Sequence, residues 1–129
     1  MAKIEKFEDL EVWQKARKLC NEIYPLTLKE SFVKDFKLRD QINASSGSIM
    51  DNIAEGFERD GKIEFRQFLS IAKGSCGEVR SQLYRAIDRS HITSIEFDSL
   101  KSQAEDISKQ LKGFISYLNT SEFKGAKFK

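Results

Sequence analysis

Hydrophobic residues recur at helical spacing along most of the chain. Near its start they form two rows, Leu10, Trp13, Ala16, Cys20 and Ile23 in one, and Val12, Leu19 and Leu26 in the other. Two apolar rows on one helix indicate that more than one side of it is covered. The pattern predicts a first helix that bends or ends near Pro25, because proline has no N–H to donate to the helical backbone.

A second helix is predicted over about 38–58, after a connection at 28–37 that has room for a partial turn. Its apolar face is a narrow stripe on a helical wheel, with Ile49 and Ile53 within about 20° of Ile42 and the small residues Ser46 and Gly56 within about 40° of it. Small residues on a core face let another backbone approach closely. Gly56 suits such tight packing or the end of the helix.

A row of polar residues lies beside this apolar stripe, within an arc of about 80°. Its members are Gln41, Ser45, Ser48, Asn52 and Glu55, and a matching flank of the following helix carries Ser75, Glu78 and Gln82. Buried polar groups are costly unless they are hydrogen-bonded. We therefore expect the two rows to face each other or a shared neighbour. Asn52, Glu55, Ser75 and Glu78 are predicted to form a network that sets helix register or a subunit contact, with a ligand pocket as the alternative.

The second half of the chain predicts two more helices. The residues ERDGK form a turn with a positive φ angle at Gly61, and an apolar face then runs over 64–90. The residues HITS interrupt it, and Ser94 is the predicted N-cap of the last helix. That helix has a heptad series, Leu100, Ala104, Ile107, Leu111, Phe114 and Leu118.

Four amphipathic helices with short links, and no strand-like alternation, predict an all-α fold. The expected architecture is an antiparallel up-and-down four-helix bundle that occupies residues 1–120 as one domain. The remaining segment, 121–129, contains glycine and lysine and has little to bury. It is predicted to be a flexible basic tail.

Composition narrows the range of functions without choosing one. The 129 residues are 40% hydrophobic and 33% charged, with a net charge of +2 and a pI near 8.5. Nucleic-acid binding is therefore permitted but not required. No apolar stretch approaches the ~20 residues of a membrane span, and the N-terminus lacks a signal-peptide core. Cys20 and Cys76 have no zinc or CxxC spacing, so we expect a cytoplasmic protein with reduced thiols.

Catalytic, metal and cofactor sites are not expected from the sequence. His91 is the only histidine, which leaves a ferritin-like di-iron centre without its Glu-x-x-His ligands. Glu55, Glu64 and Glu78 could bind a hard cation only as isolated carboxylates. No serine lies in a nucleophile elbow, and neither cysteine has a histidine nearby in sequence. The run KGSCGE falls inside a helix instead of between a strand and a helix, where a phosphate loop is found.

Basic residues form a stripe on the third predicted helix. Lys62, Arg66, Lys73 and Arg80 fall within an arc of about 40° over about 27 Å, and Tyr84 extends the line. One interpretation is that these side chains pair with acids or extend along apolar surface to reach water. The other is a surface that follows phosphates, with Tyr84 as a ring on which a base stacks. Several copies arranged around a common axis would strengthen its attraction for phosphate.

Three stretches carry a resemblance to a known family: FEDLEVWQKARKL at 7–19, DQINASSGSIMDNIAEGFER at 40–59 and EFRQFLSIAKGSCGEVRSQL at 64–83. In this order they resemble the four-helix-bundle proteins of the 23S rRNA intervening-sequence family. The resemblance implies a homopentameric barrel without enzymatic activity. A similar fold serves as the accessory protein of diversity-generating retroelements, where a basic surface engages nucleic acid and a reverse transcriptase.

One departure from the family pattern bears on nucleic-acid binding. Many members carry two basic residues shortly after the glutamine that matches Gln41, and this chain has Asn43 and Ala44 there. Lys73 keeps the positive charge that is usual before Gly74. The leading hypothesis is a non-enzymatic homo-oligomer that binds structured RNA or DNA, or a nucleic-acid enzyme. The alternatives are a protein-interaction scaffold with no nucleic-acid role and, less favoured, a carboxylate-ligated metal enzyme.

Overall fold

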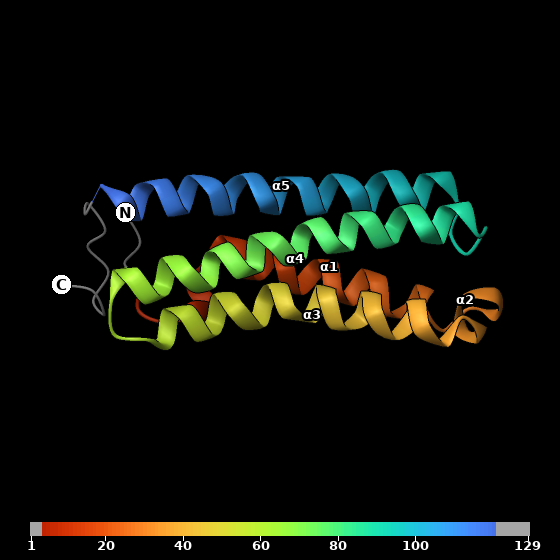
Figure 1. Ribbon diagram of the computed structural model, residues 1–129, viewed down its shortest axis with the longest axis horizontal. Helices are drawn as coiled ribbons and strands as arrows, with labels where there is room; N and C mark the ends of the chain where they lie inside the picture. Colours follow the sequence, from red (N-terminus) through yellow and green to blue (C-terminus); the bar gives the residue numbers. More distant parts are fainter. Residues whose placement is uncertain (1–3, 121–129) are drawn as a thin grey trace.

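The computed structural model describes residues 4–120, apart from the side chain of Glu30. Within this range the long helices are α1 (Glu11–Leu26), α3 (Phe36–Glu58), α4 (Lys62–Asp88) and α5 (Ser94–Asn119). Two short elements accompany them, the 3-10 helix η1 (Phe7–Asp9) and α2 (Glu30–Lys34). Successive long helices run in opposite directions (Figure 1). The predicted all-α bundle is confirmed, whereas the predicted tail at 121–129 lies outside the described residues.

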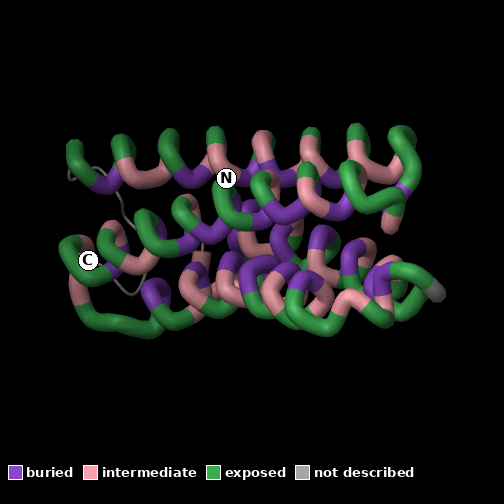
Figure 2. The backbone as a smooth tube through the Cα atoms, turned by 45° about the vertical axis from the view of Figure 1, so that its right-hand side comes forward, coloured by how far each residue is buried: buried purple, intermediate pink, exposed green. Residues whose placement is uncertain are grey.

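The four long helices pack in a closed ring around one hydrophobic core. α3 lies between α1 and α4, and α5 packs on α4 and on α1, with the most extensive contact between α3 and α4. Buried positions line the inner side of each helix, and exposed positions lie on the outside (Figure 2). The core includes the predicted rows, among them Leu19, Ile49, Leu69 and Leu111, each fully buried. Helical periodicity therefore fixes both the elements and the faces they turn inward.

Helix ends follow local capping chemistry. α4 begins after Gly61, whose φ angle of +152° confirms the predicted positive value. The predicted N-cap of α5 is wrong, because Thr93 occupies that position and Ser94 is the first helical residue. Thr93 Oγ1 accepts a hydrogen bond from the backbone N–H of Glu96, and the Glu96 carboxylate accepts one from the N–H of Thr93. This reciprocal pair is a capping box, which a threonine followed three residues later by glutamate favours.

α3 packs closely against α4 at Gly56. Among the described glycines within these two helices, this one has the least space for a side chain. A Cβ atom added to this buried residue would lie 2.6 Å from Phe68 Cβ and 3.1 Å from Phe65 Cδ1. A Cβ contact of 2.6 Å is essentially never found in real proteins, so a larger residue at this position requires α3 and α4 to shift apart. The sequence predicts either tight packing or the end of the helix at Gly56, and the structure shows tight packing, two residues before α3 ends.

Candidate nucleic-acid interface between α4 and α5

The basic stripe of α4 lies on the flank that faces α5. Lys62, Arg66, Lys73 and Arg80 are all half-buried. Near one end of the flank, the Arg66 guanidinium donates a hydrogen bond to the side-chain carbonyl of Asn119 at the end of α5. Further along, Arg80 lies opposite Glu105, Ser108 and Lys109. The stripe is therefore one wall of a surface to which α5 contributes the other.

A polar depression of about 310 Å³ lies in this surface, lined by Arg80, Glu105, Ser108 and Lys109. Its single carboxylate is already paired, because Glu105 Oε2 lies 3.3 Å from Lys101 Nζ. Arg80 Nε, by contrast, is buried and has no hydrogen-bond partner among the described residues. The depression thus combines a guanidinium, an ammonium and a hydroxyl group. An anion such as a phosphate group is the ligand that this combination suits.

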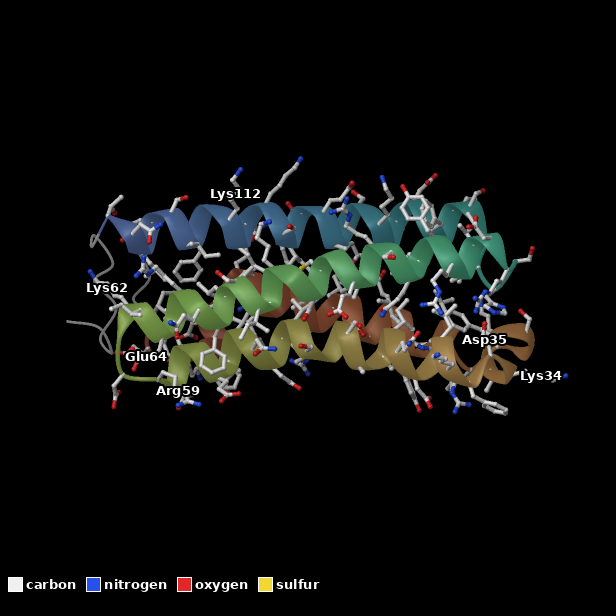
Figure 3. The ribbon with its side chains drawn as sticks, in the orientation of Figure 1. Lys34, Asp35, Arg59, Lys62, Glu64 and Lys112 are labelled. Carbon is white, nitrogen blue, oxygen red and sulfur yellow. The ribbon has the colours of Figure 1, made fainter. Side chains whose placement is uncertain are left out.

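The α5 side of this surface adds lysines that the sequence analysis left out. Lys109 and Lys112 are exposed, and Lys112 points away from the bundle into solvent (Figure 3). They were missed because the predicted positive surface was confined to the third helix. The signal was present in the sequence, since Lys101, Ser108 and Lys112 recur on one side of α5 at helical spacing.

Tyr84 is 47% exposed, at the end of the basic stripe. Its ring contacts Phe97 of α5 edge to face, with the ring centroids 4.9 Å apart and the planes at 68°. This contact holds the phenol ring in place. Because the ring is about half exposed, it remains accessible to a stacking partner.

The polar rows of α3 and α4 meet at two places along the interface between these helices. Midway, Ser75 Oγ donates to Ser48 Oγ over 3.0 Å, and the Asn52 amide donates to Ser48 Oγ over 2.9 Å. The Asn52 amide also reaches the Ser48 carbonyl oxygen at 2.7 Å. These groups satisfy one another within one chain. Their arrangement fits a role in the register of α3 against α4.

The second meeting point lies closer to the α2 end of the bundle. The Gln82 amide donates to Ser45 Oγ over 3.0 Å, and Ser45 Oγ donates to the Gln41 carbonyl over 2.9 Å. Arg85 Nη1 donates to Gln41 Oε1 over 3.1 Å. Arg85 is a member that the sequence analysis missed, although it lies three residues after Gln82 and so on the same side of α4.

The two glutamates expected in this network lie outside it. Glu55 is exposed and pairs with Arg59 one turn later, at 2.8 Å. Glu78 is also exposed. Carboxylates are strongly hydrated and gain little from a half-buried interface that amides and hydroxyls already fill. The network among described residues is therefore built of neutral groups and one arginine.

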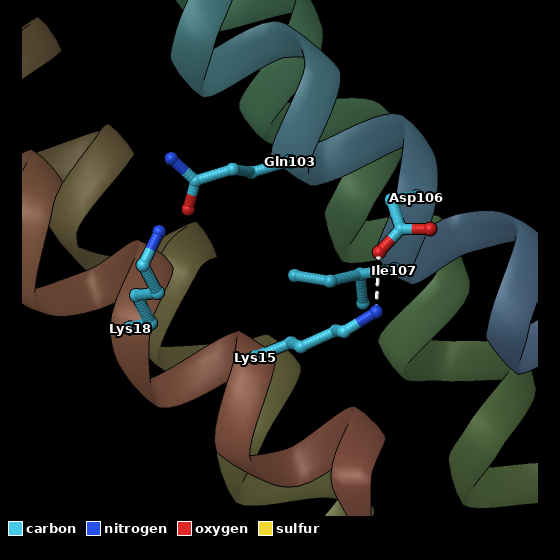
Figure 4. Close-up of a pocket in the computed structure, with 5 residues that line it drawn as sticks. All are labelled: Lys15, Lys18, Gln103, Asp106 and Ile107. Atoms are coloured by element: carbon cyan, nitrogen blue, oxygen red, sulfur yellow. Dashed lines mark hydrogen bonds and ion pairs between the residues drawn. The ribbon is translucent and has the colours of Figure 1, made fainter.

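A second depression, between α1 and α5, is lined by Lys15, Lys18, Gln103, Asp106 and Ile107 (Figure 4). Lys15 Nζ crosses it to Asp106 Oδ2 at 2.8 Å. This hydrogen bond is the main cause that lowers the pKa of the Asp106 carboxyl. The charges that line this depression are paired within the chain, which distinguishes it from the depression beside Arg80.

Potential metal ligands are dispersed among the described residues. No group of three or more histidine, cysteine, aspartate or glutamate side chains is placed there to bind a metal ion. Cys20 and Cys76 are free, and burial raises the pKa of the Cys76 thiol to about 12. No helix within residues 4–120 has an apolar stretch long enough to cross a bilayer.

Comparison with known proteins places the chain in a family. No curated protein matches it. A crystal structure of a protein of unknown function from the S23 ribosomal protein family of Bacteroides thetaiotaomicron is 27% identical. Its TM-score is 0.75, and the match covers 81% of this chain and 97% of that one. The family model of the 23S rRNA-intervening sequence protein matches residues 8–113. The chain therefore belongs to the 23S rRNA-intervening sequence protein family.

Proposed function

We propose that this protein binds the phosphate backbone of structured RNA or DNA through its α4–α5 surface, as a cytoplasmic homo-oligomer. The observation that carries the proposal is the depression beside Arg80, where Ser108 and Lys109 approach a guanidinium that lacks a full set of partners. The surface binds and does no chemistry on the nucleic acid. The proposed partner is a nucleic acid that binds to this surface, or an enzyme that acts on nucleic acid and binds to the same surface.

The spacing of the basic stripe favours contact with several phosphates of a nucleic-acid backbone and not with a single bound anion. Arg66, Lys73 and Arg80 are seven residues apart, which separates successive side chains by about 10 Å along α4. Lys109 and Lys112 widen the positive surface on α5. Cations spread in this way neutralise several phosphates and release counterions, so the affinity should depend strongly on salt.

Self-association is supported by the outer face of α4. Ile63 and Ile71 are 61% and 52% exposed there. Between Ser70 and Ser81 this face also carries Gly74 and Gly77, which have open space at their Cβ positions. Apolar side chains beside small residues suit close contact with another helix. The family resemblance makes five copies the expected number. In a ring of five, the positive electrostatic potentials of the α4–α5 surfaces would add and attract phosphate more strongly.

The nucleic-acid proposal is tested by fluorescence anisotropy with an RNA hairpin and a DNA duplex between 50 and 200 mM salt. We expect the triple variant Arg66→Ala, Lys73→Ala and Arg80→Ala to bind at least about 10-fold more weakly. Its slope of log affinity against log salt should fall by about 2 to 3. The matched control replaces Arg17, Lys34 and Lys37, which are exposed on other faces, and should keep the slope.

Two results would overturn this proposal. One is the absence of binding to either nucleic acid at 50 mM salt. The other is an equal loss of affinity in both triple variants, because net charge alone would then explain the binding.

The assembly is tested separately by light scattering. We expect a mass about five times the 14.9 kDa of one chain. A mass of one chain would remove the oligomer from the proposal and leave the binding surface to be judged by its own experiment.

A protein-interaction scaffold is the second candidate function. It is favoured by large apolar side chains exposed toward the α2 end, of which Ile95 and Phe36 are 81% and 64% exposed. Exposed apolar surface of this kind is common at protein contacts. Co-purification of one stoichiometric protein that survives nuclease treatment, together with no nucleic-acid binding, would favour it.

A further inference from the structure

Four polar side chains from two segments, 31–35 and 89–91, meet at the α2 end of the bundle. Ser31 Oγ in α2 lies 3.0 Å from His91 Nδ1, in the turn after α4. The other ring nitrogen of His91, Nε2, lies 2.9 Å from Asp35 Oδ2. Arg89 Nη1 lies 2.8 Å from the same carboxylate oxygen. Ser31, His91 and Asp35 therefore form a continuous hydrogen-bonded chain, with Arg89 at its far end.

Hydrogen-bond directions in this chain follow from the charge of Asp35. Hydrogen bonds from His91 and Arg89 lower the pKa of the Asp35 carboxyl to about 2, so at neutral pH the carboxylate only accepts. The His91 Nε2–H must then be the donor to it. In a neutral imidazole this leaves Nδ1 as an acceptor, which receives the hydroxyl proton of Ser31.

The ring of His91 is held firmly in this orientation. It stacks on the buried ring of Phe32, with centroids 4.8 Å apart and planes at 17°. Only 8% of the His91 side chain is exposed, and its backbone N–H donates to the Ala86 carbonyl over 2.9 Å. The preceding residue, Ser90, has a φ angle of +61°. Such a backbone is strained for a residue other than glycine, and strain of this kind is frequent at functional sites.

We propose that Ser31 is an activated nucleophile, with His91 as its general base and Asp35 as the residue that orients the imidazole. A nucleophile within hydrogen-bond reach of a base, and a base oriented by a third group, is the arrangement by which serine hydroxyls are activated. Ser31 is exposed, whereas the base is shielded. The substrates that fit are small acyl or phosphoryl esters that reach the hydroxyl from solvent.

The proposed step transfers an acyl or phosphoryl group to Ser31. Ser31 Oγ forms a bond to the carbonyl carbon or phosphorus atom while its proton moves to His91 Nδ1. The bond to the leaving group breaks, and the leaving alkoxide takes the proton from Nδ1. Asp35 and the Nε2–H keep their hydrogen bond throughout and stabilise the transient imidazolium. A water molecule can reverse the sequence and release the acid.

This chemistry is separate from the proposed binding surface. Asp35 lies at the α2 end of the bundle, and Lys62, where the basic stripe begins, lies at the opposite end (Figure 3). The sequence alone does not reveal this serine as a nucleophile, because Ser31 and His91 are 60 positions apart. The two side chains meet only when α2 folds back onto the α4–α5 turn.

The test uses the full chain and an alkyl fluorophosphonate probe, in which fluoride is the leaving group. Intact mass and peptide mapping should show one adduct per chain, at Ser31. Ser31→Ala should abolish it, and His91→Gln and Asp35→Asn should each slow labelling at least about 10-fold, since general bases contribute about 10² or more. The control Ser116→Ala, at an exposed position of α5, should label like the unaltered protein.

A spectroscopic readout separates activation from mere folding. Because His91 is the only histidine, its ¹⁵N ring signals are unambiguous and should report the Nε2–H tautomer. In Asp35→Asn that tautomer should lose population while the helical circular dichroism is retained. The proposal is overturned by an adduct rate at Ser31 no higher than at Ser116, by labelling that His91→Gln and Asp35→Asn leave unchanged, or by an Nδ1–H tautomer.

Discussion

Gly56 shows how one residue sets the distance between two helices. An added Cβ would lie 2.6 Å from Phe68 Cβ, an atom that cannot move without its backbone. We expect Gly56→Ala to lower the free energy of unfolding by about 1–2 kcal/mol, because overpacking outweighs the gain in helix propensity. Urea denaturation measures this difference.

Gly113→Ala is the matched control for Gly56, since nothing lies within 4 Å of its Cβ position in α5. This variant should be unchanged or more stable by up to about 1 kcal/mol. Equal effects of the two substitutions would show that α3 and α4 are not in close contact at Gly56.

Asp35 makes stability depend on pH in the acid range. Its pKa is lowered to about 2 by hydrogen bonds from His91 and Arg89. A carboxyl with a lowered folded-state pKa stabilises the fold above its unfolded pKa of about 4, and this contribution is lost as the pH falls toward 2. We expect Asp35→Asn to cost about 1–2 kcal/mol at pH 7, with allowance for its partial exposure. The gap should close between about pH 4 and 2 in urea titrations; a gap of constant size would contradict this origin.

Residue contacts across long sequence separations were the least predictable feature. Ser31 and His91 belong to segments that carry no apolar period, so the pattern predicts only a connection over 28–37. The local sequence pattern does not predict that Phe32 is buried or that its ring stacks on His91. The half-buried position of Arg80 was equally hidden, because the sequence places it in a stripe on one helix and does not say that α5 packs beside that stripe.

Thr93 governs the start of α5 at the scale of elements. Its hydroxyl accepts from the Glu96 N–H at 3.1 Å, and it is the N-cap in place of the expected Ser94. We expect Thr93→Ala to lower the free energy of unfolding by about 1 kcal/mol, because one orphan N–H of the first turn loses its acceptor. Ser94→Ala should change it by less than about 0.5 kcal/mol. Thermal or urea melts compare the two, and the reverse order would restore Ser94 as the cap.

Elements with a long apolar period were predicted well, and short ones were not. The 23 residues of α3 and the 26 of α5 carry enough turns to establish a face. α2 has five residues, too few for a period. The polar rows of α3 and α4 were identified by the same periodicity. Which of their members form hydrogen bonds between α3 and α4 depends on side-chain length and charge. Glu55, for example, forms an ion pair with Arg59 of its own helix and makes no contact of this kind among the described residues.

At the scale of the whole molecule, the contacts between neighbouring helices of the bundle differ in extent and in kind. α3 and α4 share the most extensive contact, whereas α1 and α5 are joined in part by exposed polar pairs such as Lys15–Asp106. Exposed pairs of this kind contribute only about 0–1 kcal/mol each. We expect native-state hydrogen exchange to be slowest for amides of α3 and α4, and faster for those of α1 and α5.

Amide exchange that protects α1 more than α4 would contradict this order. High salt should accelerate exchange along the α1–α5 contact more than along the α3–α4 contact, because only the first relies on exposed charges. The order is measured by mass spectrometry on the unaltered protein.

The up-and-down path of the chain places the start of α1 and the end of α5 beside the turn between α3 and α4, with α2 at the opposite end (Figure 1). The 26 residues of α5 span about 39 Å. Tethering the protein to a surface at the turn between α3 and α4 would therefore leave Ser31 and His91 facing the solution at about that distance. Labelling of the immobilised protein with the fluorophosphonate probe, or a single-molecule measurement, could use this geometry without altering a buried residue.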